Sequence, residues 1–301
     1  MANINGTNNN DLLNGTNEND LIQGFNGIDN ISGGEGKDTI SGGNQADFLF
    51  GDAGDDWLSP DNGVGDIVDG GEGIDTASFE FEVQTVSVDL SKVINGYSFA
   101  IGSSGNSSKL VNIENLSGGS GSDVLTGDGG ANTIWGNGGD DTIAGNGGID
   151  TIYGGNGKDL LFGGAGTDFM YGDGGDDILN GYGRQPGQPA PIRQFREFDE
   201  LTGGTGKDTF VLGDSQEAYY RGGGYATIKD FDMNYDKIQL KGSKNDYNMF
   251  KVNVEGRVDT LIYYGASTTG SGGDLVATLQ GVEGVSFTTG NNVLTSYFSF
   301  V

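Results

Sequence analysis

Large apolar residues recur at every ninth position over long parts of the chain, each of them two residues after an Asp or Asn. Between residues 11 and 58 they are Leu13, Ile22, Ile31, Ile40, Leu49 and Leu58, and between residues 118 and 179 they are Leu125, Ile134, Ile143, Ile152, Leu161, Met170 and Leu179. The segment around each apolar residue is long enough only for a short strand with one inward side chain. One repeat therefore predicts half a coil. Two repeats predict a full coil of eighteen residues that stacks on the next at about 4.8 Å.

The other half of each repeat is rich in Gly, as in GGNGKDLLF at 154–162. Glycine adopts the positive φ values of tight turns at little cost, and the Asp closes the turn. Since turns eighteen residues apart lie over one another, two rows of polar side chains are expected. In the second repeat block these rows are Asp123, Asp141, Asp159 and Asp177 on one side, and Asn132, Asp150 and Asp168 on the other.

The motif GGxGxDxUx, with U a large apolar residue, resembles the hemolysin-type nonapeptide repeat of the RTX (repeats-in-toxin) family. The resemblance implies an all-β fold, a parallel β-roll with roughly ten or more Ca²⁺ ions between successive turns. Each ion would be held by Asp carboxylates and backbone carbonyls, the oxygen ligands that calcium prefers. The implied metal ligands are Asp11, Asp20, Asp29, Asp38, Asp47, Asp56, Asp66, Asp75, Asp123, Asp141, Asp150, Asp159, Asp168, Asp177 and Asp208.

Not all of these repeats are regular. The first two, NGTNNNDLL and NGTNENDLI, have Asn in place of turn glycines, as is common in terminal repeats that cap a stack. The turn before Asp66 carries one extra residue together with Pro60 and Val64, so we expect a poorer calcium site there.

The sequence divides into five segments: a first repeat block (1–77), an excursion (78–116), a second repeat block (117–183), a loop with Pro and Arg (184–201), and a last repeat with a C-terminal β cap (202–301). We interpret 78–116 as an excursion within one roll because IENL brings Glu114 back to the Asp position and Leu116 to the apolar one. The loop is interpreted as a surface connection, or as a contact site for a partner or another copy's acidic turns.

In the cap, Asp230, Asp232 and Asp236 are a candidate extra metal site. The segment opens like an EF-hand loop, but Tyr235 stands where Gly is needed and Lys241 where the last Glu belongs, so an EF-hand is rejected.

The net charge of the chain indicates that the rows of Asp need bound cations. The chain of 301 residues has 43 acidic and 15 basic residues and a formal net charge of −28, which half that number of divalent ions would neutralise. Two carboxylates about 5 Å apart repel by roughly 1 kcal/mol in water and roughly 3 kcal/mol at an effective dielectric constant of 20. Several such pairs would cancel the 5–15 kcal/mol that typically stabilises a domain. We therefore expect an unfolded chain without calcium, and neither nucleic acid nor an anionic membrane as partner.

Absent residue types exclude most catalytic chemistry. The sequence has no His and no Cys, so it offers no imidazole base, no thiol, no disulfide and no zinc site of the usual kind. The repeats begin near residue 5, so we expect no effector domain ahead of them. We therefore predict that the chain is not an enzyme.

The N-terminus has neither a basic nor an apolar run, so no signal peptide is expected, and no segment approaches the roughly 20 apolar residues of a membrane span. The family resemblance instead implies type I secretion, read from a C-terminal signal that we place in the tail NNVLTSYFSFV at 291–301. The expected location is extracellular or at the cell surface.

The predicted function is that of a secreted calcium-binding protein with a structural, surface-layer or self-assembling role, through head-to-tail or lateral contacts between copies. The alternative is a carbohydrate-associated binding module, or an accessory of a polysaccharide-modifying enzyme, with cell-surface glycans as partners.

Overall fold

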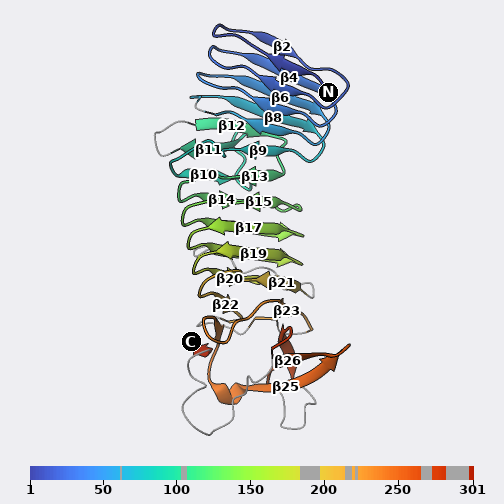
Figure 1. Ribbon diagram of the computed structural model, residues 1–301, viewed down its shortest axis with the longest axis vertical. Coiled ribbons are helices and arrows are strands. Elements are labelled where there is room, and N and C mark those ends of the chain that lie inside the picture. Colours follow the sequence, from blue (N-terminus) through green and yellow to red (C-terminus); the bar gives the residue numbers. More distant parts are fainter. Residues whose placement is uncertain are drawn as a thin grey trace. The chain divides into compact units, whose positions relative to one another are not determined.

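The computed structural model describes residues 1–61, 63–102, 107–183, 197–213, 219–220, 223–265, 273–282 and 298–301. Contacts divide the chain into two compact units, Met1–Ile143 and Ala144–Val301. Each unit is built from two sheets of short strands that alternate along the chain (Figure 1). Strand β16 (Thr142–Gly148) contains the boundary between the units.

In the first unit, one sheet follows the order β1 (Asn3–Asn5), β3 (Leu21–Gln23), β5 (Thr39–Ser41), β7 (Trp57–Ser59), β9 (Thr76–Ser78), β13 (Asn115–Ser117) and β15 (Thr133–Trp135). The other follows β2 (Leu12–Asn14), β4 (Asn30–Glu35), β6 (Phe48–Ala53), β8 (Ile67–Glu72), β12 (Ser107–Val111), β11 (Ser98–Gly102), β10 (Val86–Asp89) and β14 (Val124–Thr126).

In the second unit, one sheet follows β17 (Thr151–Asn156), β19 (Phe169–Gly174), β21 (Phe198–Thr202), β23 (Tyr225–Ile228), β27 (Asp274–Leu279), β26 (Arg257–Tyr264) and β25 (Tyr247–Val254). The other follows β18 (Leu160–Gly166), β20 (Ile178–Asn180), β22 (Thr209–Val211), β24 (Lys237–Leu240) and β28 (Phe298–Phe300). A short 3₁₀ helix, η1 (Lys244–Asp246), precedes β25.

Residues eighteen apart are paired in parallel, so each coil takes two repeats. Ile22 pairs with Ile40 and Ile31 with Leu49, and all four side chains are completely buried. The inward row of the second unit is buried in the same way, while Ile4 and Leu13 in the first coil remain partly exposed. The predicted fold class, an all-β parallel β-roll, is confirmed.

The segment 78–116 is built into the first unit. Strands β10, β11 and β12 pair antiparallel with one another, while β12 pairs parallel with β8 and β10 parallel with β14. In the opposite sheet β13 lies between β9 and β15, with Leu116 beside Ala77 and Ile134. The excursion therefore adds three strands to one sheet, while the other keeps its sequence of single strands.

In the second unit, strands β25, β26 and β27 form an antiparallel meander, and β27 joins β23 in parallel. Residues 184–196 of the predicted loop and residues 291–297 of the predicted secretion signal lie outside the described residues, while Phe298–Phe300 pair with β24. Within the described ranges, no helix is both long and apolar enough to cross a bilayer.

Candidate metal-binding turns

Except for the partly exposed Asp11, the Asp that closes each turn is buried and held by a ladder of hydrogen bonds. Its Oδ1 accepts the backbone N–H of the Asp eighteen residues earlier: Asp38 accepts from Asp20 and Asp56 from Asp38, both at 2.7 Å. In the second unit Asp177 accepts from Asp159 at 2.9 Å. One carboxylate oxygen in each of these turns therefore joins two consecutive coils.

The second oxygen, Oδ2, has no hydrogen-bond donor in many of the turns and is inaccessible to solvent. This holds for Asp29, Asp38, Asp47, Asp56, Asp75, Asp168, Asp177 and Asp208. A buried carboxylate oxygen without a donor is costly, since it has lost its hydration and gained nothing in return. These eight oxygens are therefore acceptors that need a positive partner. Asp141, Asp150 and Asp159 are buried at the same position of their repeats.

Glycine is required where each Oδ2 lies. At Gly33, a Cβ atom would come far closer than 3.0 Å to Oδ2 of Asp38 and within 2.7 Å of the carbonyl oxygen of Gly51. Gly51 meets Asp56 and the carbonyl of Gly70 in the same way. A carboxylate oxygen and a backbone carbonyl oxygen thus approach the same small space in successive coils. Both are ligands that Ca²⁺ prefers, so the turns fit the ion that the repeats imply.

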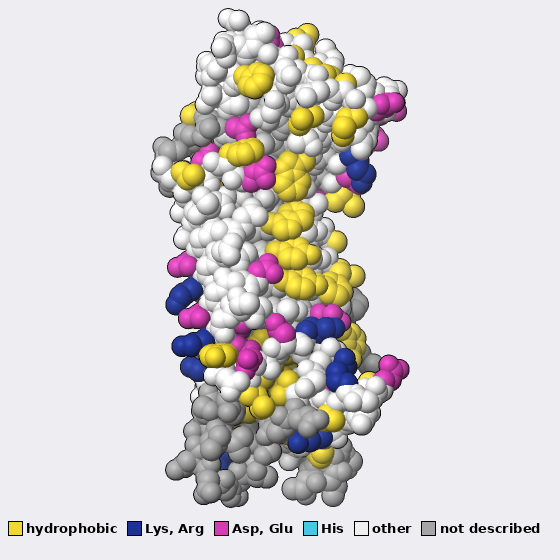
Figure 2. Space-filling view, viewed as in Figure 1, with side chains coloured by type: hydrophobic (Ala, Val, Ile, Leu, Met, Phe, Trp, Pro, Cys, Tyr) yellow, Lys and Arg dark blue, Asp and Glu magenta, His cyan; other side chains and the backbone are white. Residues whose placement is uncertain are grey.

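Burial makes these carboxylates weak acids in the absence of metal. It raises the pKa of Asp47, Asp56 and Asp177 to about 7, and that of Asp75 and Asp208 to about 6. For Asp168, burial and then the nearby Asp199 raise the pKa to about 9. The carboxylates of adjacent coils contribute to the same shifts, as Asp75 and Asp38 do around Asp56. The charge of a bound divalent cation would offset both the lost hydration and the repulsion between carboxylates. On the face in Figure 2, the remaining acidic side chains are scattered rather than gathered in one patch.

Irregular turns supply their own hydrogen-bond donors. Oδ2 of Asp20 accepts the backbone N–H and the hydroxyl of Thr16, and hydrogen bonds from Ala2 and Thr16 lower the pKa of Asp20. Thr7 bonds Asp11 in the same way.

In two further turns a single group reaches Oδ2. Ser108 donates its hydroxyl to Asp66 at 3.1 Å, and Gly119 donates its N–H to Asp123 at 2.7 Å. In the turn of Asn132, the amide Nδ2 donates to the carbonyl of Glu114 at 2.6 Å. These turns already have a protein partner for the polar group, whereas Oδ2 of the eight Asp residues named above has none. That Asp66 is a poorer calcium site than its neighbours stays a prediction.

The candidate extra site in the cap is not a cluster. The two oxygens of Asp230 accept the N–H groups of Gly203 and Gly204, while Asp232 Oδ1 caps Asn234. Asp236 extends the ladder, because its Oδ1 accepts the N–H of Asp208 at 3.0 Å and its Oδ2 that of Asp232. No group of three or more acidic residues suited to a metal ion occurs among the described residues, here or elsewhere. A cation in these turns would therefore depend on backbone carbonyls, and calcium at 230–236 stays a prediction.

The sequence reasoning missed a ladder member. Asp199 Oδ1 accepts the N–H of Asp168 at 2.9 Å, and its Oδ2 accepts the hydroxyl of the buried Tyr220 at 2.5 Å. Its signal was present, since Asp199 stands two residues before Leu201 and four before Gly203, but the preceding insertion breaks the period of nine. Glu114 fills the same role for Asp75 through Oε2, at 2.9 Å.

Comparison with known proteins gives one family. The model of the RTX calcium-binding nonapeptide repeat matches four copies, at residues 5–27, 23–58, 117–152 and 144–179. No curated protein matches. Among solved structures, the AlgE6R3 subunit of the Azotobacter vinelandii mannuronan C5-epimerase is 21% identical over 53% of this chain and 72% of its own, with a TM-score of 0.25.

The extracellular lipase LipA of Serratia marcescens is 16% identical over 92% of this chain, with a TM-score of 0.20. The match covers 37% of the lipase. The repeat motif, the coil period and the buried carboxylates agree, so residues 5–58 and 117–179 carry RTX calcium-binding nonapeptide repeats that wind into a β-roll.

Proposed function

We propose that this chain is a secreted protein that folds when Ca²⁺ binds its repeats, and that the folded roll then serves a structural, surface-layer or self-assembling role outside the cell. The observation that carries the proposal is the row of buried Oδ2 atoms without a donor. The Asp carboxylates and the backbone carbonyls of adjacent coils would hold the ions, which supply the positive charge that the turns lack. The number of ions is roughly ten or more, as expected from the repeats.

The energetic case rests on coupling between binding and folding. In the unfolded chain the carboxylates are hydrated and far apart, whereas folding buries them in rows, so the roll alone is opposed by desolvation and repulsion. Ligands that exist only in the folded chain convert binding free energy into folding free energy. At extracellular calcium concentrations, sites with affinities of 10⁻⁴–10⁻³ M would be filled.

Circular dichroism during a calcium titration tests this coupling. The chain should be largely unfolded in excess chelator and should become β-rich cooperatively as calcium rises toward millimolar concentrations. Magnesium at the same concentration is the control, because it demands tighter octahedral geometry and should not substitute. An unchanged β spectrum in chelator would contradict the proposal.

Secretion is the second element of the proposal. The interior of cells holds calcium far below these affinities, so the chain would stay unfolded there and would be trapped in the folded form outside by mass action. Deleting residues 291–301 should keep the protein inside the cell through loss of the type I secretion signal. The purified deletion variant should still fold with calcium, and its normal export would refute this signal.

The extracellular role is proposed to be non-catalytic and based on contacts between copies. Electron microscopy and light scattering at millimolar calcium should reveal ordered assemblies that chelator dissolves. A protein that remains monomeric at high concentration would favour the carbohydrate-binding alternative instead. That alternative has a structural observation of its own, a surface pocket in the first unit.

A further inference from the structure

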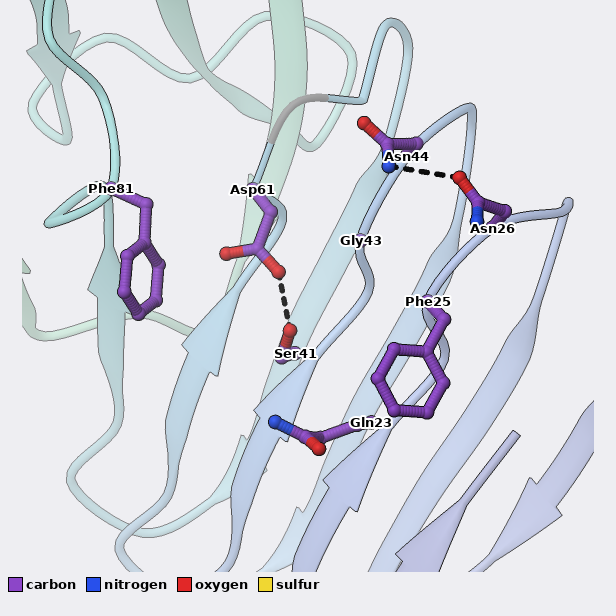
Figure 3. A pocket seen from close by; sticks show the side chains of 8 residues that line it. All are labelled: Gln23, Phe25, Asn26, Ser41, Gly43, Asn44, Asp61 and Phe81. Carbon is purple, nitrogen blue, oxygen red and sulfur yellow. Dashed lines mark hydrogen bonds between the residues drawn. The ribbon is translucent and has the colours of Figure 1, made fainter. Parts of the chain in front are cut away.

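The first unit contains a pocket of about 330 Å³ on the outer side of the roll, away from the buried Asp rows. Its floor includes Gln23 of β3 and Ser41 of β5, which are partners in adjacent strands. In Figure 3, the rings of Phe25 and Phe81 lie on opposite sides of Asp61 and Ser41. The volume is at the low end of the roughly 300–1,000 Å³ of small-molecule sites.

Two lining residues have backbone conformations that side chains disfavour. Phe25 has φ 73° and Asp61 has φ 55°. Phe25 stands at the second position of the turn, where the next turns have Gly34 and Gly43 with φ 104° each. A bulky residue with positive φ costs of order 1–3 kcal/mol, and such strain is concentrated at functional sites. Neither residue belongs to the rows of Asp that close the turns and are implied as calcium ligands.

The aromatic rings are exposed rather than used in the core. Phe81 is 62% and Phe25 43% exposed, although both could gain from burial. Exposed aromatic rings around a hollow with polar groups are typical of sites that bind ligands with one apolar face.

The polar groups of the pocket are held in place by hydrogen bonds. Asp61 accepts the hydroxyl of Ser41 through Oδ2 and that of Ser59 through Oδ1 at 2.5 Å. Asn44 donates to Asn26 at 3.0 Å, as drawn in Figure 3, and Asn26 donates to Asn8 at 2.6 Å. Each carboxylate or amide oxygen has two lone pairs, so these groups can accept further hydrogen bonds from a ligand hydroxyl.

Charge decides the class of ligand. Among the described residues that line the pocket are Asp61 and no Lys or Arg, so an anionic ligand would meet a negative charge there and no cationic partner. A pyranose ring combines an apolar face of C–H groups with a rim of hydroxyls that donate and accept. We infer that this pocket binds a neutral sugar unit of a polysaccharide, with Phe25 and Phe81 against its apolar faces and Gln23, Asn44 and Asp61 on its hydroxyls.

The inference needs the folded roll but not its proposed extracellular structural role, and the experiment keeps the two apart. The full chain is first shown by circular dichroism to be folded in millimolar calcium. Neutral oligosaccharides built from glucose, mannose, xylose or galactose are then titrated by calorimetry, with an oligouronate as the charged comparison. We expect one of the neutral series to bind and the oligouronate not to bind.

Two variants locate the site and a third is their control. Phe81→Ala and Gln23→Ala should each weaken binding about tenfold or more, which corresponds to 1.4 kcal/mol. Phe48→Ala removes a partly exposed ring of the first unit that does not line the pocket, and it should bind as the wild type does.

Phe25→Gly separates function from structure. Glycine suits φ 73°, so this variant should fold at a lower calcium concentration than the wild type while it loses sugar binding. The inference is overturned if folded protein binds no neutral sugar at millimolar concentration, if the oligouronate binds better, or if Phe25→Gly and Phe81→Ala leave binding intact. A chain that fails to fold with calcium would overturn the proposed function instead.

Discussion

Replacing one buried Asp of the turns by Asn should stabilise the roll in the absence of calcium and destabilise it in the presence of calcium. Asp56 is the residue of choice, because its Oδ1 bonds the N–H of Asp38 while its Oδ2 has no donor. Asn in its place keeps an oxygen for Asp38 and directs an NH₂ group toward the carbonyls beside Gly51. The turn of Asn132 contains such an arrangement, in which Nδ2 donates to a carbonyl oxygen at 2.6 Å.

The expected size follows from the pKa of Asp56. Burial, with smaller contributions from Asp75 and Asp38, raises that pKa from 3.8 to about 7. At 1.36 kcal/mol for each pH unit this corresponds to about 4 kcal/mol of unfavourable burial of the charged form. Solvent near the turn should reduce it to about 2 kcal/mol. In chelator at pH 8, Asp56→Asn should therefore be about 2 kcal/mol more stable than the wild type.

The direction of the pKa shift of Asp56 determines how stability changes with pH. Because the folded pKa lies above the unfolded one, the folded wild type binds more protons between about pH 4 and 7 and loses stability as pH rises through that window. The advantage of Asp56→Asn should be complete above pH 7 and vanish toward pH 4. In saturating calcium the variant lacks a ligand and should be less stable, by about 2.7 kcal/mol if calcium is at 100 times the dissociation constant.

Urea or osmolyte titrations followed by the fluorescence of Trp57 and Trp135, whose rings lie 5.8 Å apart, measure these differences. An osmolyte can bring the metal-free chain into its transition range. Asp20→Asn is the matched control, because Thr16 already bonds Oδ2 of Asp20 and hydrogen bonds lower its pKa. It should destabilise the metal-free chain. If Asp56→Asn did the same, the buried charge of Asp56 could not be what destabilises the metal-free roll.

Two further perturbations test the same account. In excess chelator, acidification from pH 8 to about pH 4 should restore a β-rich circular dichroism spectrum. The pKa values of Asp47, Asp177 and Asp208 are raised in the folded chain, which therefore takes up protons as the pH falls and gains stability. If the β signal did not increase, burial of charged carboxylates could not be the cause of the instability. Gly54→Ala should cost about 3 kcal/mol or more of stability in the calcium-loaded protein, because Gly54 has φ 145° and a Cβ there would collide with the carbonyl of Gly36. A Cβ at Gly129 meets no atom within 4 Å, so Gly129→Ala should be nearly neutral in the same thermal unfolding assay. Equal melting temperatures for the two glycine variants would refute the close approach of the coils.

Much of this fold follows from a period of nine because a β-roll is a local structure. Leu49 and Leu58 could be placed in the core from sequence since each coil contacts only its neighbours. Asp199 could not be placed in the ladder from sequence, because an insertion precedes it and the period of nine residues no longer gives its position. Strand β10 (VSVD) alternates apolar and polar residues, but this alternation does not reveal that it pairs with β11 and β14, and β11 (SFAIG) and β12 (SSKLV) do not alternate.

The candidate site was predictable in residue type and not in detail. Sequence placed Asp20 and Asp56 in equivalent turns, and only the structure shows that Thr16 satisfies one of them while the other has no donor. The pocket beside Phe25 has no periodic signal in the sequence, because Phe25 is a single departure from the repeat, at a position where the next turns have Gly34 and Gly43.

The hydrogen-bond ladder has a direction, because each Asp that accepts in it takes an N–H group from the coil before it. Asp56 accepts from Asp38, while its own N–H donates to Asp75. Loss of the Asp56 side chain therefore leaves the amide of Asp38 without an acceptor and leaves the amide of Asp56 bonded. In hydrogen exchange of Asp56→Ala, protection should fall at residue 38 and persist at residue 56. A lesion in the roll is thus transmitted toward the N-terminus, and the coils that follow it keep their main-chain connections.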